Sequence, residues 1–401
     1  MRVLHLIERY LPPSQVWLYL LLKKTQQEVQ HHIGTRAILD NEFRSPAFEL
    51  IEAQRGAYRL ALKAIAGNRL SRYVQHLSLA SQQIFKPTEA REWMVYVQEN
   101  QIDLIHLHFG PHACEHLDWL ASAPVPFVVS FYGYDYEKAP FQKPHLRSAY
   151  RRLFKLAAGI ICEGGHGKKI LAEQYDCVPA KLHVVPLGID LKEWPTPAPK
   201  IKEQGQLRLL QVADFTAKKG QLDTIAAAIT AKEQVPELTL TLVGRARDVA
   251  YAEACHTAIQ KASAGSWIRT QTFIPIHELR GLMQRHDAFI HPSRYTDQRD
   301  CEGGAPTILF YAQCLGLPII STRHCDIPAV VRDGVSGQVV AEGDVFGLQA
   351  VIEQMAAVSG EQWQQQQTQT ISWGREVADL NRGARALRQL YQQLKMKESR
   401  S

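Results

Sequence analysis

The segment from Glu302 to Thr307 combines residue types that suit a ligand carrying both phosphate and hydroxyl groups. Gly303 and Gly304 let the backbone approach such a ligand closely. Pro306 is expected in the first turn of a helix, where free backbone N–H groups favour phosphate. Glu302 can accept hydrogen bonds from hydroxyl groups. The simpler alternative is a plain helix start after a charged loop.

Lys218 and Lys219, followed by Gly220, form a second candidate anion site a few residues after a predicted strand. At a strand–loop–helix crossing, the backbone N–H groups and the helix dipole add to the charge of a lysine. Taken alone, an ordinary charged loop is an equally good interpretation of this segment.

Four histidines and a cysteine crowd the end of another predicted strand: His106, His108, His112, Cys114 and His116. Their types suit zinc, but their spacing matches no standard motif. We therefore expect no metal here. We interpret one of the histidines as a side chain at the carboxyl end of a strand, where open parallel sheets bind ligands.

Two further strand ends carry polar groups next to glycine. The segment from Ser130 to Asp135 contains Tyr132 and Gly133, a glycine that permits a tight turn, and Asp135 can accept a hydrogen bond from a hydroxyl. Glu163 is followed by two glycines. Neither segment is specific alone. Together with the first two, they predict polar residues at the carboxyl ends of strands on both sides of a cleft.

The elements that must position these residues follow an α/β alternation, which is typical of parallel sheets. In the first half of the chain the predicted strands are 2–7, 102–107, 126–131, 159–162 and 182–186. In the second half they are 207–213, 238–243, 269–273, 288–291 and 318–322.

The composition changes at residues 194–199, where three prolines cannot continue a helix or a central strand. We interpret 194–206 as a stiff linker. It would join an N-terminal domain, 1–193, to a C-terminal domain, 207–375, which the family resemblance described below assigns to the acceptor and to the nucleotide-sugar donor. A final helix within 376–401 is expected to pack back towards the N-terminal domain. The predicted fold class is α/β, with two facing Rossmann-like domains and a cleft between them.

The composition excludes several classes of protein. With 45% hydrophobic and 21% charged residues, the 401-residue chain is neither disordered nor collagen-like. The longest apolar run, 16–22, is too short to span a membrane, and Glu8 and Arg9 interrupt any signal-peptide pattern. Seven cysteines without a C-x-x-C motif indicate reduced thiols. We therefore expect a cytoplasmic protein.

The formal net charge of +6 permits an anionic partner without requiring one. Residues 51–100 read as a helical, basic insert with Arg55, Arg59, Lys63, Arg69 and Arg72. The simpler interpretation is a solvated helical face. The sharper one is peripheral contact with anionic lipid, or a lipid-linked acceptor, at the inner face of the plasma membrane.

Read together, these segments resemble GT-B fold glycosyltransferases of family 4, particularly the group 1 enzymes of exopolysaccharide (colanic-acid-type) synthesis. The resemblance covers nearly the whole chain and is most specific in the C-terminal half. Its motifs include Pro13-Ser14-Gln15, His106-Leu107-His108-Phe109-Gly110, Phe131-Tyr132-Gly133-Tyr134-Asp135, Val185-Pro186-Leu187-Gly188, Lys218-Lys219-Gly220, Leu242-Val243-Gly244, Glu302 to Pro306, Ser321-Thr322-Arg323-His324 and Asp333-Gly334-Val335-Ser336-Gly337.

The resemblance implies a retaining transfer of a sugar from a nucleotide-diphosphate sugar to a hydroxyl of a glycan or lipid-linked acceptor, without a metal. Lys219 would neutralise the diphosphate, and Glu302 would hold the hydroxyls of the donor sugar. On this basis we predict catalytic roles for Glu302, Lys219, Tyr132 and His108. The predicted donor-binding residues are Lys218, Lys219, Gly303, Gly304, Ala305, Pro306, Thr307, Tyr311 and Arg245, and the predicted acceptor-side residues are Ser14, Gln15, His108, Asp135 and Glu163.

Four positions depart from the residues usual in the family: Asp214 replaces an arginine, Tyr132 a histidine, and Tyr311 and Ala329 each a glutamate. Asp214 places a negative charge near the expected phosphates, where Lys218, Arg245 or Arg294 would have to compensate. The alternative prediction is therefore a non-catalytic homologue that acts as a binding or scaffold protein.

Two other functions are disfavoured. A nicotinamide-dependent oxidoreductase would carry G-x-G-x-x-G after a first strand, and neither half does. Nucleic-acid binding would need a basic helix–turn–helix or an aromatic and basic array, which the sequence lacks.

Overall fold

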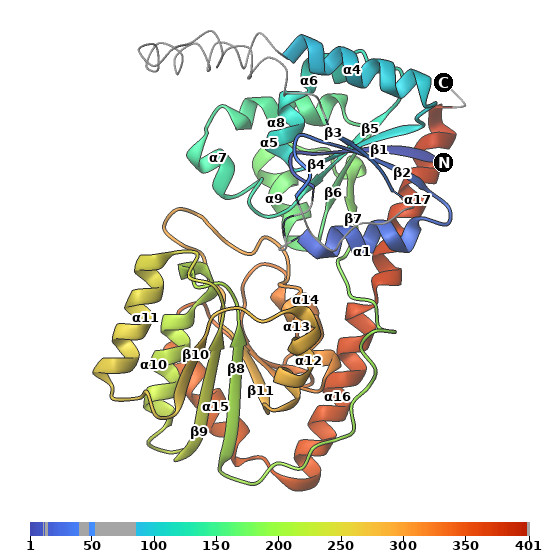
Figure 1. Cartoon of the computed structure of the whole chain (residues 1–401). Helices are drawn as coiled ribbons and strands as arrows, with labels where there is room; N and C mark the ends of the chain where they lie inside the picture. Colours follow the sequence, from blue (N-terminus) through green and yellow to red (C-terminus); the bar gives the residue numbers. More distant parts are fainter. Residues whose placement is uncertain (11, 13–14, 40–47, 53–85, 399–401) are drawn as a thin grey trace, which may run out of the picture.

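The chain forms two parallel sheets, one above the other in Figure 1. The computed structural model describes residues 1–10, 12, 15–39, 48–52 and 86–398. The first sheet has the order β3-β2-β1-β4-β5-β6-β7, and the second has the order β10-β9-β8-β11-β12-β13. All strand pairs within both sheets are parallel. The predicted fold class is confirmed.

The first sheet consists of β1 (Arg2–Ile7), β2 (Gln30–Thr35), β3 (Phe48–Glu52), β4 (Leu104–His108), β5 (Phe127–Phe131), β6 (Gly159–Cys162) and β7 (Leu182–Val184). The helical elements between these strands are α1 (Val16–Thr25), α4 (Lys86–Glu99), α5 (Gly110–Glu115), α6 (Leu117–Leu120), α7 (Lys138–Gln142), α8 (Leu146–Leu156), α9 (Gly165–Tyr175) and the short 3₁₀ helix η2 (Pro179–Lys181).

The second sheet consists of β8 (Gln206–Val212), β9 (Glu237–Val243), β10 (Ile268–Gln271), β11 (Ala288–His291), β12 (Ile319–Thr322) and β13 (Gly337–Val340). Its helical elements are η3 (Ala217–Lys219), α10 (Gln221–Ala231), α11 (Val249–Lys261), α12 (Ile276–Gln284), α13 (Ile308–Cys314), α14 (Ile327–Val330) and α15 (Val345–Ala357). Two long helices, α16 (Gly360–Ala378) and α17 (Leu380–Glu398), end the described chain.

Helix α17 returns to the first sheet. Its Leu387 and Tyr391 are buried in one apolar cluster with Val3 of β1 and Val128 of β5. In Figure 1 this helix runs beside α1, and both termini lie next to the first sheet. The chain therefore crosses between the two sheets twice, once before β8 and once between α16 and α17.

The proline-rich segment predicted as a linker is anchored at both ends. Trp194 is buried, and its ring packs 4.6 Å from the ring of Tyr311. At the other end, the buried ammonium of Lys202 donates to the carbonyls of Glu203, Gln206 and Ala356. Because a buried ammonium needs such acceptors, these bonds hold the segment against the second sheet.

The predicted helical insert is wrong at its beginning, because residues 51 and 52 belong to strand β3. Strand β3, Phe48–Glu52, pairs with β2 at the edge of the sheet. The basic residues at 55–72 lie outside the described residues, and α4 begins at Lys86. Within the described part of the chain, no helix is both long enough and apolar enough to cross a bilayer.

Candidate active site

The carboxyl ends of the two sheets meet through two glycines. Gly133, after β5, and Gly303, after β11, have φ angles of 56° and 79°, which side chains rarely adopt. A Cβ atom on Gly133 would lie 2.7 Å from the Cα of Gly303, so no larger residue fits. The Tyr136 hydroxyl donates across the same contact to the Gly303 carbonyl at 2.8 Å. Donor-side and acceptor-side residues are therefore brought to one place.

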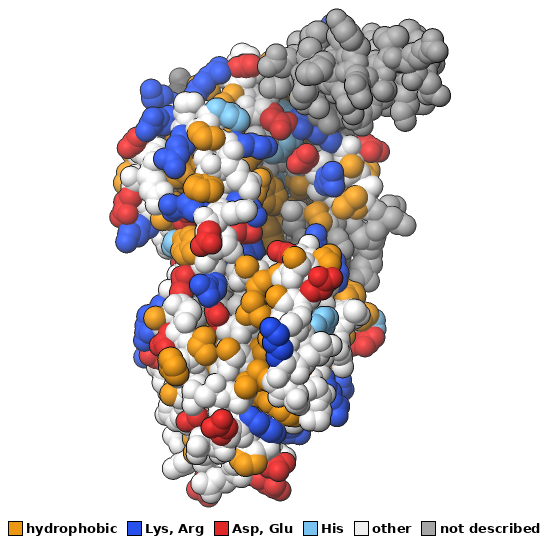
Figure 2. All heavy atoms as spheres, turned by 90° about the vertical axis from the view of Figure 1, so that its left-hand side faces the viewer, with side chains coloured by type: hydrophobic (Ala, Val, Ile, Leu, Met, Phe, Trp, Pro, Cys, Tyr) orange, Lys and Arg blue, Asp and Glu red, His pale blue; other side chains and the backbone are white. Residues whose placement is uncertain are grey.

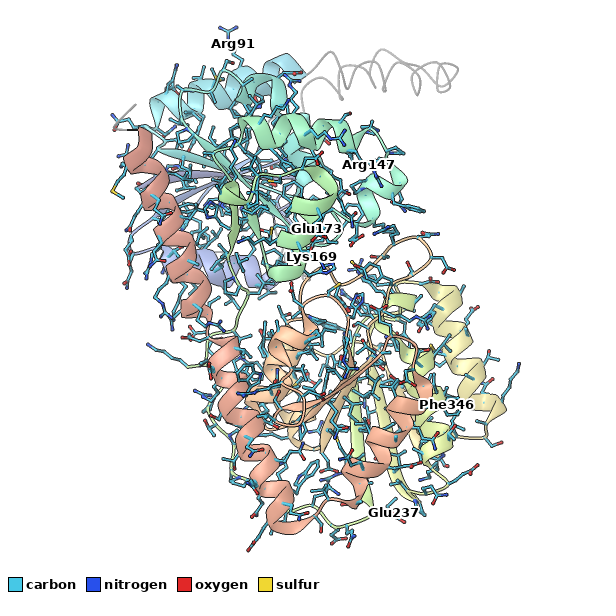
Figure 3. All side chains as sticks on the ribbon, turned by 180° about the vertical axis from the view of Figure 1, so that it is seen from behind. Arg91, Arg147, Lys169, Glu173, Glu237 and Phe346 are labelled. Atoms are coloured by element: carbon cyan, nitrogen blue, oxygen red, sulfur yellow. The ribbon has the colours of Figure 1, made fainter. Side chains whose placement is uncertain are left out.

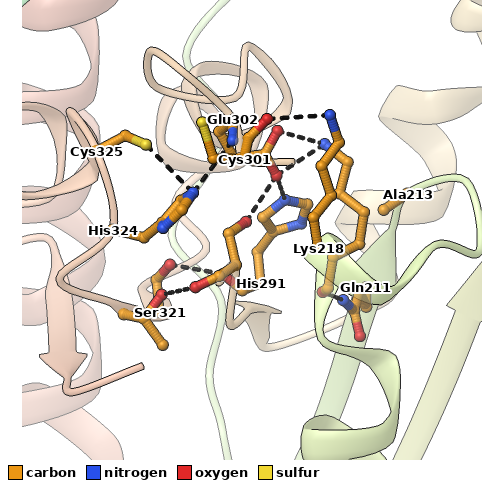
Figure 4. A network of polar contacts seen from close by, with 12 residues as sticks. Gln211, Ala213, Lys218, His291, Cys301, Glu302, Ser321, His324 and Cys325 are labelled. Carbon is orange, nitrogen blue, oxygen red and sulfur yellow. Dashed lines mark hydrogen bonds and ion pairs between the residues drawn. The ribbon is translucent and has the colours of Figure 1, made fainter. Parts of the chain in front are cut away.

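Lys219 and Glu302, predicted from separate motifs, form an ion pair in this region. The Lys219 ammonium lies 2.8 and 2.7 Å from the two carboxylate oxygens of Glu302. Ser293 donates its hydroxyl to the same carboxylate at 2.7 Å, and Nε2 of His291 lies 3.4 Å away (Figure 4). Only 7% of the Glu302 side chain is exposed. Burial alone would raise the pKa of Glu302, but Lys219 and His291 hold it well below its usual value.

Lys218 points to a different carboxylate. Its ammonium donates to Asp300 at 3.1 Å and to the Cys301 carbonyl at 3.0 Å. Burial would lower its pKa, but Glu302 and Asp300 raise it overall. The two neighbouring lysines are thus both held by groups from the loop after β11.

Asp214 does not leave an uncompensated negative charge near the lysines. Arg245 binds its carboxylate through Nε and a terminal nitrogen, both at 3.0 Å, and Arg247 adds a third contact at 2.9 Å. Burial raises the pKa of Asp214, but the two arginines hold it below its ordinary value. The three side chains together carry a net charge of about +1, since one carboxylate faces two guanidinium groups. The main reason for predicting an inactive scaffold is thereby removed.

On the donor side, the predicted position of Pro306 is wrong, and the predicted role of Tyr311 stays a prediction. Helix α13 begins at Ile308 with Thr307 at the N-cap, so Pro306 precedes the cap and is not in the first turn. In the segment before the helix, Gly303 packs against Gly133, and a Cβ atom on Gly304 would clash with the Glu163 carboxylate. Tyr311 is buried in the core against Trp194, and its donor contact stays a prediction.

The first sheet supplies acids in a different state. Asp135 is fully buried and accepts a hydrogen bond from the Tyr132 amide at 2.9 Å. Burial raises the pKa of Asp135 to about 8, and burial together with Asp326 raises the pKa of Glu163 to about 8. Both carboxyl groups are therefore mostly protonated at neutral pH and can donate as well as accept hydrogen bonds.

A chain of hydrogen-bonded, buried histidines ends at the hydroxyl of Tyr132. His31 contacts Nε2 of His5 at 2.9 Å, and Nδ1 of His5 contacts His108 at 3.0 Å. Nδ1 of His108 then contacts the hydroxyl of Tyr132 at 2.8 Å. Burial lowers the pKa of His31 and of His108 to about 3, so these rings are neutral at pH 7. His108 and Tyr132, both predicted as catalytic, are therefore hydrogen-bonded to each other.

Two further residues were predicted on the acceptor side, Ser14 and Gln15. Gln15 is the N-cap residue of helix α1, and Ser14 lies outside the described residues. The Trp17 ring packs 4.6 Å from the ring of Tyr132. The beginning of α1 therefore covers Tyr132.

Sequence reasoning missed a group of contacts between the two halves. Tyr295 and Arg299, from the charged loop after β11, both donate to Glu137 at 2.8 Å. Lys138 of α7 contacts Asp300 from the same loop at 2.9 Å. The only available signal was the density of charge between residues 294 and 300, which does not reveal its partners.

Comparisons with known proteins agree with this arrangement. A family model described as "Glycosyl transferases group 1" matches residues 193–369, and one described as "Glycosyltransferase Family 4" matches 56–193. Among solved structures, an Anabaena protein, Alr3699/HepE, in complex with UDP-glucose superposes with a TM-score of 0.71 over 100% of both chains, at 15% identity. A glycosyltransferase from Rickettsia africae gives a TM-score of 0.70 over 98% of both chains, at 13% identity.

Two curated relatives match parts of the chain. An amylovoran biosynthesis glycosyltransferase (AmsK) of Erwinia amylovora is 28% identical over 63% of this chain and 60% of its own length. A putative colanic acid biosynthesis glycosyltransferase (WcaL) of Salmonella typhimurium is 29% identical over 45% of this chain and 44% of its own length. The chain thus matches less than two thirds of the length of either relative.

The fold and the facing strand ends define a GT-B protein with two Rossmann-like halves. Because the two family models together cover residues 56–369, the chain belongs to the group 1 glycosyltransferases of family 4.

Proposed function

We propose that this protein transfers a sugar, with retention of configuration, from a nucleotide-diphosphate sugar to a hydroxyl of a glycan or lipid-linked acceptor. The observation that carries the proposal is the buried Lys219–Glu302 ion pair next to Gly303, where the two halves touch. The names of the relatives support a role in exopolysaccharide or surface glycan synthesis.

The ion pair provides both groups that the transfer needs. When a donor enters, the Lys219 ammonium moves from the Glu302 carboxylate to the diphosphate and stabilises the charge that develops on it as it leaves. Glu302 is then free to accept hydrogen bonds from hydroxyls of the donor sugar. Each charge has a partner before and after binding, so neither is left buried and unpaired.

The glycine contact between the halves serves the same chemistry. Gly133 packs against Gly303 and the backbone carbonyl of Glu302, so the two halves are in direct contact beside Glu302. Excluding water limits hydrolysis of the donor and strengthens the electrostatic contacts. The neutral groups opposite, His108, Tyr132, Asp135 and Glu163, can exchange hydrogen bonds with an acceptor hydroxyl without holding a charge.

A donor screen tests the proposal. One structural neighbour was solved with UDP-glucose, and a relative from Mycolicibacterium smegmatis, 23% identical over 61% of this chain, is named as GDP-mannose-dependent. We expect one UDP- or GDP-sugar to raise the melting temperature by mass action. Lys219→Ala should abolish the shift, whereas Lys261→Ala, on the exposed end of α11, should keep it. No shift with any nucleotide sugar at millimolar concentration would overturn the proposal.

We also propose that the transfer needs no metal, because Lys218 and Lys219 supply the positive charge at the diphosphate. Dialysis against a chelator is then expected to leave turnover undiminished. A loss of turnover that added Mg²⁺ or Mn²⁺ restores would contradict this.

A peripheral membrane contact at the cytosolic face fits the surface of the first half. Helix α8 exposes Arg147, Arg151, Arg152 and Lys155. Figure 2, which views the side of the molecule on the left of Figure 1, shows Lys and Arg side chains over the first half. Figure 3 shows Arg147 at the surface of α8. Basic side chains near an anionic surface bind it electrostatically. We expect more protein to pellet with anionic than with neutral liposomes, and equal pelleting would overturn the contact.

A further inference from the structure

Two cysteines and a histidine lie together beside Glu302. Cys301 precedes Glu302 in the loop after β11, and His324 and Cys325 follow β12. Because β11 and β12 are neighbours in the sheet, their carboxyl ends bring these residues together. The two sulfurs and a ring nitrogen of His324 lie within 4.8 Å of one another (Figure 4). Cys301 and His324 are buried, and Cys325 is half-buried.

The surroundings of His324 determine which nitrogen can bind a ligand. Its Nδ1 lies 2.7 Å from a carboxylate oxygen of Glu342, which can only accept a hydrogen bond. Nδ1 therefore carries the proton, and Nε2 keeps its lone pair. Nε2 accepts from the Glu302 amide at 3.1 Å and lies 3.2 Å from the sulfur of Cys325. A carboxylate behind a histidine in this way is a common support for a metal ligand.

The backbone at Cys325, within this cluster, adopts a strained conformation. Its φ angle is 46°, in the left-handed region that residues other than glycine rarely adopt. Such strain persists where the surroundings over-determine the conformation, often at functional sites. Both cysteines are free thiols. The cluster thus offers two thiols and one oriented imidazole.

We propose that Cys301, His324 and Cys325 bind one Zn²⁺ ion. Ligand atoms around tetrahedral zinc lie about 3.5–3.8 Å apart, as follows from bonds of ~2.3 Å to sulfur and ~2.0 Å to nitrogen. Small side-chain rotations bring this cluster to that spacing. Both thiols lose their protons to solvent on binding, so two thiolates balance the charge of the ion. A water molecule takes the fourth position.

Zinc binding would change the neighbouring ion pair. Nε2 of His324 can serve either the ion or the Glu302 amide, but not both. When the ion takes Nε2, the backbone of Glu302 loses its acceptor, and the carboxylate shifts relative to Lys219. We therefore expect zinc to weaken donor binding. This second effect rests on the proposed function, whereas metal binding itself does not.

Cobalt titration of the whole reduced protein tests the site. We expect one Co²⁺ per chain with thiolate-to-cobalt charge-transfer absorption, displaced by Zn²⁺ and stronger at higher pH because two protons are released. Cys301→Ser and Cys325→Ser should each lose the band or weaken binding more than about tenfold. Glu342→Gln should weaken binding by about 10- to 100-fold, since its amide can donate to Nδ1 and leave the proton on Nε2. Cys114→Ser, outside the cluster, should bind as the wild type does.

Absence of the charge-transfer band in the wild type would overturn the site, as would an equal band in the double variant of Cys301 and Cys325. Melting curves show whether each variant folds. If a serine variant does not fold, Cys325→Ala, at a half-buried position, replaces it. A nucleotide-sugar melting shift with and without Zn²⁺ tests the second effect. An unchanged shift overturns the coupling alone. Loss of all nucleotide-sugar binding in metal-free protein overturns the proposed function, while the cobalt spectrum still decides the metal site.

Discussion

The polar groups on and after the strands of the two sheets differ in their electrostatic state. Around the carboxyl ends of the second sheet, opposite charges are paired: Lys219 with Glu302, Lys218 with Asp300, Arg245 with Asp214 and Arg294 with Asp223. On and after the strands of the first sheet, His5, His31, His106, His108 and Asp135 are buried and Glu163 is half-buried, with few opposite charges nearby. Burial then drives these histidines and acids to their neutral forms.

This difference matches the two substrates that we propose. A diphosphate carries charge that strengthens during transfer, so it needs cations that stay charged in the fold. An acceptor hydroxyl is neutral, and a charged group facing it would have to lose water for little gain. The charged side therefore suits the donor, and the neutral side suits the acceptor. Four changes test this division, from the largest expected effect to the smallest.

The largest effect is expected on the charged side. Lys219→Ala should lower kcat by about 10²- to 10³-fold, because it removes a group that stabilises charge in the transition state. Glu302→Gln should lower kcat comparably, and the double variant should lose less than the product of both, since the two groups act as a pair. Steady-state kinetics with the best donor measures this. Turnover of Lys219→Ala within twofold of wild type would contradict the assignment.

The neutral side is tested by the pH dependence of stability. The pKa of Asp135 is about 8 in the fold and about 3.9 in an unfolded chain, so the folded state holds the proton more tightly. Its contribution to stability is complete below about pH 4 and is lost as the pH rises to about 8. The free energy of unfolding of the wild type, minus that of Asp135→Asn, should therefore fall by a few kcal/mol over this range.

Urea unfolding at about pH 5, 7 and 9 measures that difference, and the titration of the buried histidines cancels in it. Asp118→Asn, at a largely exposed acid, is the matched control and should show no such slope. A difference that stays constant with pH would mean that Asp135 is ionised, and the two sides would then be less distinct.

Glu137, in the first half, differs from the neutral acids there: it is ionised, and Tyr295 and Arg299 of the second half bind it. Burial would raise its pKa, but His166, Arg299 and Tyr295 lower it overall. Glu137→Gln keeps the size but removes the charge, and should weaken the contact between the halves by about 1–3 kcal/mol. X-ray scattering should show a larger radius of gyration. Asp176→Asn, which removes an exposed pair with Arg151, should leave the radius unchanged.

The smallest effect is expected at Asp214. Asp214→Asn frees Arg245 and Arg247, so the positive potential at the donor side rises. Donor affinity should increase by a few-fold at low ionic strength and less at high ionic strength, because salt screens exposed charges. Calorimetric titration at two salt concentrations measures this. Weaker donor binding would show that Asp214 orients Arg245 for the donor.

Strands were predictable where apolar residues predominate over a short run. The predictions for 2–7, 159–162 and 288–291 coincide with β1, β6 and β11. Strand β2 was missed because His31, His32 and Gly34 interrupt the apolar pattern. Those histidines are buried, and they form hydrogen bonds with residues far along the chain, His31 with His5 and His32 with Tyr96. A local sequence pattern does not reveal such partners.

The site was predictable as two segments but not as a contact. The motifs indicated Lys219 and Glu302 only separately, because they stand 83 positions apart along the chain. The pairing of Lys218 with Asp300 and the capture of Asp214 by two arginines depend on loop conformations. Pro306 was misplaced by two positions because the preceding loop, held by Gly133, continues further before the helix begins.

The sequence by itself determined the α/β alternation, the family, and which residue types stand at the strand ends. These follow from periodicity and local motifs, which need only neighbours along the chain. Only the tertiary structure decided which charges meet and which groups are neutral. The pKa of a side chain depends on its burial and on the charges around it, and at this site those come from loops far apart in the sequence.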